Sequence, residues 1–108
     1  DICYELNLKN TEKKWEVLIA GGLKLSWSPE EYVFRMEFTD GKLGCGRGLR
    51  AREIKVCKDI RIVVDVSCVE VFMNGGKDVF STRFYPEKDQ YTVKASGDGL
   101  TGSYRYRV

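Results

Sequence analysis

The sequence predicts an all-β protein, a sandwich of two antiparallel sheets, on three observations. Apolar and polar residues alternate with a period of two along most of the chain, as expected of strands with one buried face. Nowhere does an apolar stripe recur at the spacing of an amphipathic helix. Turn signals such as Gly21-Gly22, Asp40-Gly41 and Asn74-Gly75 divide the chain into about ten short strands, which is the pattern of a sandwich.

Four alternating segments precede the Asp40-Gly41 turn. The residues that we expect on their apolar faces are Ile2, Tyr4, Leu6 and Leu8, then Trp15, Val17 and Ile19, then Leu23, Leu25 and Trp27, and finally Tyr32, Phe34, Met36 and Phe38. In the second half, the strands are expected at roughly 54–57, 60–66, 69–73, 78–85, 91–95 and 100–107.

A glycine-rich stretch over residues 41–48 raises the question of a phosphate-binding loop. Neither the Gly-Lys-Ser/Thr ending nor a helix whose N-terminus could face an anion is indicated there. A turning loop is the better interpretation, with Arg47, Arg50 and Arg52 in solvent.

The length of 108 residues fits one domain over residues 1–108. Because the chain begins at Asp1 without an initiator methionine, we expect an excised fragment or a mature form. The 18 basic and 16 acidic residues nearly cancel, whereas nucleic-acid-binding proteins gather positive charge. No apolar run approaches the roughly 20 residues of a membrane-spanning helix. We therefore expect neither a nucleic-acid partner nor a membrane segment.

Four cysteines and the lack of histidine limit the chemistry that the chain can perform. Cys3, Cys45, Cys57 and Cys68 form no Cys-x-x-Cys pair, which argues against a zinc site, and no cofactor is predicted. Free thiols that behave as small apolar groups are the favoured interpretation, although three disulfide pairings stay open. Without histidine, Ser-His and Cys-His nucleophilic sites are excluded.

The meander over residues 60–85 places charges on its polar face. If Ser67-Cys68 forms the turn, Asp65 lies directly across from Glu70, and Arg83 on the next strand is the natural cation to bridge them. Paired carboxylates could serve a retaining glycosidase. An arginine shared by both would lower both pKa values, whereas an acid catalyst needs one raised. We therefore favour a structural ion-pair network on the outer face and predict no catalytic residue.

Aromatic residues offer a second candidate function, because flat rings can stack on sugars. The candidates are Trp15, Trp27, Tyr104 and Tyr106. Their neighbours of the same parity are mainly apolar, which favours positions in the core instead.

The segments from Ile60 to Gly76 and from Val79 to Pro86 carry a recognisable motif. It reads aliphatic-x-Asp-x-Ser-x-aliphatic-Glu-aliphatic-Phe-x-Asn-x-Gly, followed by Thr-x-Arg-aromatic-x-Pro. The matching residues are Asp65, Ser67, Glu70, Phe72, Asn74, Gly76, Ser81 or Thr82, Arg83 and Pro86. The motif resembles the C-terminal domain of glycoside hydrolase family 32, which includes invertases, sucrose-6-phosphate hydrolases, levanases and inulinases. Val66, Cys68 and Gly75 depart from the residues frequent at those positions in the family.

The resemblance implies a sandwich of legume-lectin or glucanase (concanavalin A-like) architecture that follows a five-bladed catalytic propeller. The family's Trp-x-Asn-Asp-Pro, Arg-Asp-Pro and Glu-Cys motifs do not occur in this sequence. The resemblance therefore implies an accessory module of an enzyme that cleaves β-fructofuranosidic bonds, with the catalytic propeller as the partner of this module. Contact with fructan or sucrose, or with a second copy of the chain, is a further expectation. Such enzymes include cytoplasmic and exported members.

Overall fold

The computed structural model describes residues 3–87 and 91–107 and is almost entirely β-structure. Its strands are β1 (Cys3–Lys9), β2 (Trp15–Ile19), β3 (Leu23–Ser28), β4 (Val33–Phe38), β5 (Leu49–Glu53), β6 (Asp59–Val64), β7 (Cys68–Met73), β8 (Asp78–Arg83), β9 (Val93–Gly97) and β10 (Thr101–Arg107). A short helical turn, α1, spans Gly41–Gly44.

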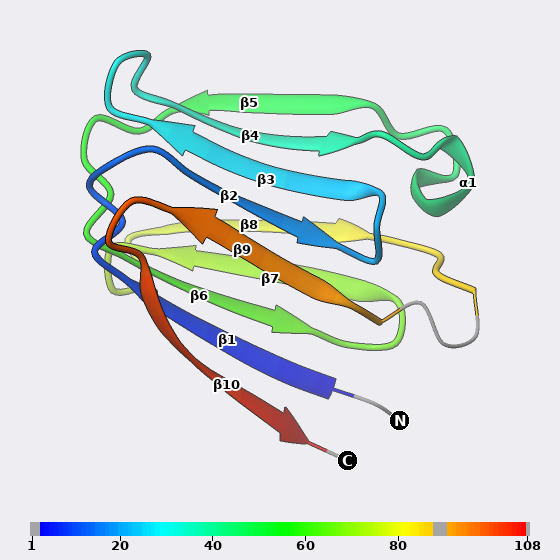
Figure 1. Ribbon diagram of the computed structural model, residues 1–108. Coiled ribbons are helices and arrows are strands. Elements are labelled where there is room, and N and C mark those ends of the chain that lie inside the picture. The colour runs from blue at the N-terminus through cyan, green and yellow to red at the C-terminus, as the bar shows by residue number, and fades with distance from the viewer. Residues whose placement is uncertain (1–2, 88–90, 108) are drawn as a thin grey trace.

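The strands form two five-stranded sheets, as Figure 1 shows. Sheet A has the order β10-β1-β6-β7-β8, and sheet B has the order β5-β4-β3-β2-β9. Every pairing between these strands is antiparallel. The predicted two-sheet antiparallel sandwich is therefore confirmed.

The core fills the space between the sheets, because alternate residues of each strand point inward. Within it, Phe34 lies 6.2 Å from Trp15 and 4.6 Å from the partly buried Phe80, measured between ring centroids. Tyr4, Val17, Leu25 and their same-parity neighbours are buried as the alternation predicts. Tyr32 is an exception, since it is half exposed and takes a left-handed backbone conformation before β4.

Two expectations for the middle of the chain were wrong. The glycine-rich loop contains α1, whose first turn is capped by the side chain of Asp40, which accepts from the Lys42 amide at 2.9 Å. The expected strand at 54–57 lies instead at Leu49–Glu53, and residues 54–58 form a crossover from sheet B to sheet A. Side chains from both sheets provide hydrogen bonds for this crossover, which is why it needs no strand partner.

Arginines of β5 close one open side of the sandwich, where both sheets end in an edge strand. Arg50 donates to the carbonyl of Ser81 on β8. Arg52 forms an ion pair with Asp78 at 3.3 Å and lies over the ring of Phe80 at 5.3 Å. Both arginines are exposed, as expected. They also tie sheet B to sheet A, while their charge discourages further strand pairing at this edge.

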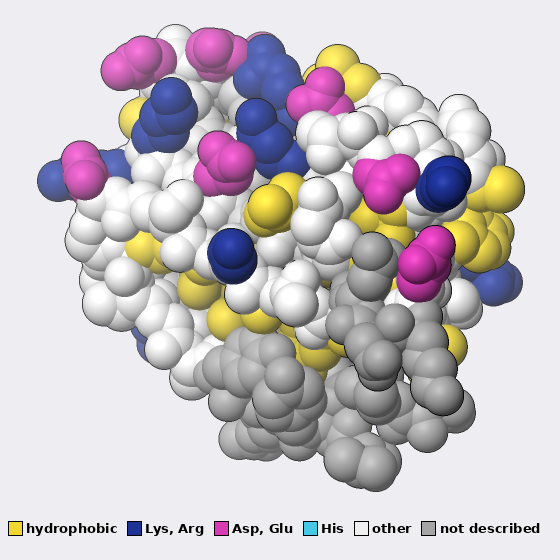
Figure 2. Space-filling model, turned by 45° about the vertical axis from the view of Figure 1, so that its right-hand side comes forward, with side chains coloured by type: hydrophobic (Ala, Val, Ile, Leu, Met, Phe, Trp, Pro, Cys, Tyr) yellow, Lys and Arg dark blue, Asp and Glu magenta, His cyan; other side chains and the backbone are white. Residues whose placement is uncertain are grey.

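Positive and negative side chains are interspersed over the surface that Figure 2 shows. On the outer face of sheet B, Glu16, Lys24 and Glu37 lie close together, and Arg35 forms an ion pair with Glu31 at 2.7 Å. In the described part of the chain, no helix is long and apolar enough to cross a membrane.

Candidate functional site

The hairpin between β6 and β7, which carries the motif, has a different register from the one expected. Val63 pairs with Glu70 and Val64 with Val69, and the Asp65 amide donates to the Cys68 carbonyl at 2.8 Å. The two turn residues are therefore Val66 and Ser67. The prediction that Asp65 lies across from Glu70 was wrong, because it placed the turn one residue too late.

The three charged motif residues, Asp65, Glu70 and Arg83, consequently have different partners and do not form the expected ion-pair network. The Asp65 carboxylate accepts from the Val66 amide at 2.5 Å and so caps its own turn. Glu70 pairs with Ser81, whereas Arg83 pairs with Cys68, which precedes Glu70 by two residues on β7. All three side chains are exposed. Among the described residues, no ion pair joins Arg83 to Asp65 or Glu70.

Asn74 holds the crossover in place. Its side-chain oxygen accepts from the Lys58 amide at 2.7 Å, and its side-chain nitrogen donates to the Val56 carbonyl at 2.7 Å. Its backbone is left-handed (φ 56°), a conformation that asparagine tolerates better than most residues. The predicted turn residue therefore also joins the β7–β8 turn to the segment that links the sheets.

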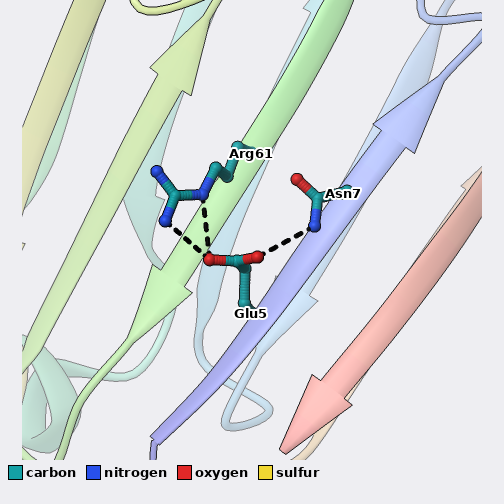
Figure 3. A network of polar contacts seen from close by, with 3 residues as sticks. All are labelled: Glu5, Asn7 and Arg61. Atoms are coloured by element: carbon teal, nitrogen blue, oxygen red, sulfur yellow. Dashed lines mark hydrogen bonds and ion pairs between the residues drawn. The ribbon is translucent and has the colours of Figure 1, made fainter.

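A network of polar side chains lies on the outer face of sheet A, and sequence analysis missed it. Arg61 donates through Nε and Nη2 to Oε1 of Glu5, at 2.9 and 2.7 Å, and Asn7 donates to the other carboxylate oxygen at 3.1 Å (Figure 3). The Arg61 guanidinium lies 5.3 Å from the ring centre of Phe72. Glu5 is only 8% exposed although it points away from the core, and these charge-assisted hydrogen bonds stabilise its carboxylate.

A surface hollow of about 480 Å³ adjoins this network. Its walls are formed by the outward side chains of β1, β6 and β7 and by the turn after β7, including Asn7, Lys9, Asp59, Arg61, Phe72, Gly75 and Gly76. The volume falls within the range of roughly 300–1,000 Å³ that is common for small-ligand sites. The mixture of hydrogen-bonding groups with one aromatic ring suits a polar ligand such as a sugar.

The aromatic candidates for sugar stacking lie elsewhere. Trp15 and Trp27 are 2% and 3% exposed and face the core, so neither ring can stack on a sugar. The indole nitrogen of Trp27 donates to the Ile54 carbonyl at 2.8 Å. Tyr104 and Tyr106 belong to β10, and their side chains lie outside the described part of the structure.

The described cysteines are free thiols: Cys57 is buried, Cys68 half-buried and Cys45 exposed. Burial raises the pKa of the Cys57 thiol, against a hydrogen bond with Thr11 that lowers it. Burial also raises the pKa of Cys68, as do the nearby carboxylates of Glu70 and Asp65, whereas Arg83 lowers it. Within the described ranges, no group of three or more potential ligands could hold a metal ion.

Comparison with known protein families identifies the family of this domain. The model for "Glycosyl hydrolases family 32 C terminal" matches residues 32–105. The chain belongs to this family. It is an accessory domain, because it forms only a small part of the hydrolases that it resembles.

The relatives of this family 32 domain are longer enzymes. It is 29% identical over 92 residues to sucrose-6-phosphate hydrolase of Bacillus subtilis (strain 168), a match that covers 83% of this chain and 19% of the relative. The sucrose-6-phosphate hydrolase structure from Lactobacillus gasseri superposes with a TM-score of 0.75 at 18% identity, covering 94% of this chain and 24% of that one. The chain thus spans about a fifth to a quarter of these proteins.

The sandwich also resembles proteins in which the same fold makes up most of the chain. A galectin from Caenorhabditis elegans superposes with a TM-score of 0.62 at 13% identity, covering 95% of this chain and 79% of the galectin. At this identity the likeness concerns the fold alone. It agrees with the lectin-like architecture that the sequence predicts for the family 32 domain.

Proposed function

We propose that this family 32 domain packs against a catalytic domain of the same polypeptide and stabilises it, while that domain hydrolyses β-fructofuranosidic bonds of sucrose, sucrose 6-phosphate or fructans. The observation that carries the proposal is the family match over residues 32–105, in a chain that covers only 19% and 24% of two sucrose-6-phosphate hydrolases. The lack of the three catalytic sequence motifs supports a role without chemistry of its own.

A covalently attached domain can stabilise its neighbour without touching the substrate. Contacts that exist only when both domains are folded favour the native state of each, as a bound ligand does. The connecting chain keeps the two surfaces at a high effective concentration, so an interface of moderate affinity is sufficient. A rigid sandwich suits this task because its core holds the outer faces in fixed positions.

Removal of residues 1–108 from the full-length protein should shorten the half-life of its glycosidase activity at elevated temperature by about tenfold or more, because the interface contacts are lost. Residual activity after heating measures this. The isolated chain, assayed with sucrose, sucrose 6-phosphate, inulin and levan, should show no turnover. Unchanged heat inactivation of the truncated protein, or turnover by the isolated chain, would contradict the proposal.

The hollow beside Arg61 favours a second candidate function, the binding of a sugar. Arg61 uses Nε and Nη2 for Glu5, which orients the guanidinium and leaves Nη1 for a ligand hydroxyl. Asn7 is oriented by the same carboxylate. Groups held in place by such contacts lose little freedom when a ligand binds.

Calorimetric titration of the isolated chain with sucrose and fructo-oligosaccharides tests this second function. We expect a dissociation constant in the millimolar range, which corresponds to a binding free energy of about −4 kcal/mol. Replacing Arg61 with alanine should then abolish the heat, whereas Arg35→Ala, on the outer face of sheet B, should leave it unchanged. A flat titration at millimolar sugar would rule the sugar site out.

A further inference from the structure

The dipeptide Asn74-Gly75 has a chemical reactivity that the other asparagines of the chain lack. Asn7 precedes leucine and Asn10 precedes threonine, whereas Asn74 precedes glycine. An asparagine loses its side-chain amide when the backbone nitrogen of the next residue attacks the side-chain carbonyl carbon. This reaction is fastest before glycine, because glycine has no side chain to hinder its own nitrogen and its backbone turns freely. The covalent chemistry therefore makes Asn74 the asparagine of this chain most open to deamidation.

Deamidation at this position joins two atoms of neighbouring residues. The Gly75 nitrogen loses its proton and forms a bond to Cγ of Asn74, while the bond from Cγ to Nδ2 breaks. Nδ2 leaves as ammonia and takes up the proton, so that a cyclic imide remains. Water then opens the ring on one side or the other and gives aspartate or isoaspartate, each with a new carboxylate. The co-reactant is water, and no oxidant or reductant takes part.

In the folded domain, hydrogen bonds engage both reacting groups. The Gly75 amide donates to Oδ1 of Asp59 at 2.9 Å. The Asn74 side chain is bound at both ends to the crossover, through the Lys58 amide and the Val56 carbonyl, each at 2.7 Å. Ring closure must break the bond from Gly75, whose hydrogen is lost, and the bond to Val56, because Nδ2 leaves. The Asp59 carboxylate also disfavours deprotonation of the Gly75 amide, since this would place one anion beside another.

The backbone of the β7–β8 turn adds to this restraint. The Asn74 amide donates to the Asp59 carbonyl at 3.1 Å, and the Gly76 amide donates to the Met73 carbonyl at 3.1 Å. Asn74 itself is held in the left-handed conformation. These contacts fix the backbone rotations that would bring the Gly75 nitrogen onto Cγ of Asn74. Asp59 therefore restrains the turn with its backbone and its side chain together.

We propose that Asn74-Gly75 is a deamidation site that the native β7–β8 turn keeps closed and that opens when the turn detaches from the crossover. The inference is independent of the proposed function. The product cannot restore the native contacts, because aspartate at position 74 has no donor for the Val56 carbonyl and sets a negative charge against its oxygen. Isoaspartate in addition lengthens the main chain within the turn. A molecule that has opened and reacted thus loses the anchor of its crossover permanently.

The rate of deamidation of the 108-residue chain tests this, measured by mass spectrometry of the peptide that contains position 74. Asp59→Ala removes the acceptor of the Gly75 amide, so the folded variant should deamidate about tenfold faster than the folded wild type, as expected for the loss of a charge-assisted hydrogen bond. In concentrated urea, the two proteins should react at one common rate, faster than either does when folded. Residue 59 is distant in sequence from the reacting pair, and its effect depends on the fold.

Ile19→Val is the matched control for general destabilisation. Ile19 is fully buried in sheet B, so the loss of one methyl group loosens the core without touching the turn, and deamidation should stay near the wild-type rate. Asn10 is an internal control. It also has a left-handed backbone (φ 61°), but it precedes threonine and should stay intact in the folded and unfolded chain over the same time.

Three results would overturn the inference. The first is an equal rate for wild-type protein in the folded state and in urea. The second is a rate for folded Asp59→Ala that matches the wild type, or matches an equally accelerated Ile19→Val, since the protection would then not lie in the turn. The third concerns the consequence: Asn74→Asp carries the product's side chain and should lower the melting temperature by about 5 °C or more. An unchanged melting temperature would show that the crossover keeps its anchor after deamidation.

Discussion

Replacing Trp27 with alanine should lower the free energy of unfolding of this domain by about 3–5 kcal/mol, as is typical of a buried aromatic residue. Trp27 is 3% exposed, and its indole nitrogen donates to the Ile54 carbonyl at the start of the crossover. The substitution would leave a large cavity in sheet B and a buried carbonyl without its donor. Chemical denaturation monitored by circular dichroism measures the change.

Trp27→Phe is the control that separates packing from hydrogen bonding. It keeps most of the apolar volume but removes the donor, so a loss of about 1–3 kcal/mol is expected. If Trp27 were a sugar-stacking residue, its replacement by alanine would leave stability nearly unchanged and weaken sugar binding instead. That outcome would contradict the core position described above.

Replacing Asn74 with alanine should lower the free energy of unfolding by about 2–4 kcal/mol. Two hydrogen bonds to the crossover are lost, each with a net contribution of about 1 kcal/mol. Alanine in the left-handed backbone conformation costs about 1–2 kcal/mol more. The measurement is again the denaturation midpoint, and an unchanged slope with denaturant would show that the unfolded state is not altered.

Asn74→Gly divides this loss into its two causes. Glycine adopts the observed φ of 56° without strain, so only the hydrogen bonds to Lys58 and Val56 are lost. Its effect should therefore be smaller than that of Asn74→Ala by about 1 kcal/mol. Equal effects of the two substitutions would show that backbone conformation contributes nothing at this turn.

Trp27 and Asn74 illustrate where sequence-based inference ended. The alternation around Trp27 indicated a strand with that residue on the apolar side, and Asn74-Gly75 indicated a turn. Neither pattern revealed that both side chains bind one segment, the crossover over residues 54–58, from opposite sheets. The hydrogen bonds join residues 16 to 27 positions apart, and such pairings leave no local periodicity.

On the polar face of the 60–85 meander, the sequence pattern predicted which residues point outward but not which of them lie opposite each other. The alternation correctly assigned Glu70, Phe72 and Arg83 to the outer face. Moving the turn by one residue replaced the expected Asp65–Glu70 pair by a Val63–Glu70 pair, and with it the expected ion-pair network disappeared. The Glu5–Arg61 contact went unpredicted because Glu5 lies on β1, 56 positions before Arg61 on the neighbouring strand β6 of sheet A.

The sequence by itself determined that this protein is a two-sheet sandwich of glycosyl hydrolase family 32, because alternation, turn residues and a local motif are properties of neighbouring positions. The tertiary structure alone decided which strands lie side by side and in what register. Those choices depend on contacts between distant segments, where a shift of one residue changes which charges meet. They placed Arg61 on Glu5 and left Glu70 and Arg83 without an ion-pair partner within the described domain.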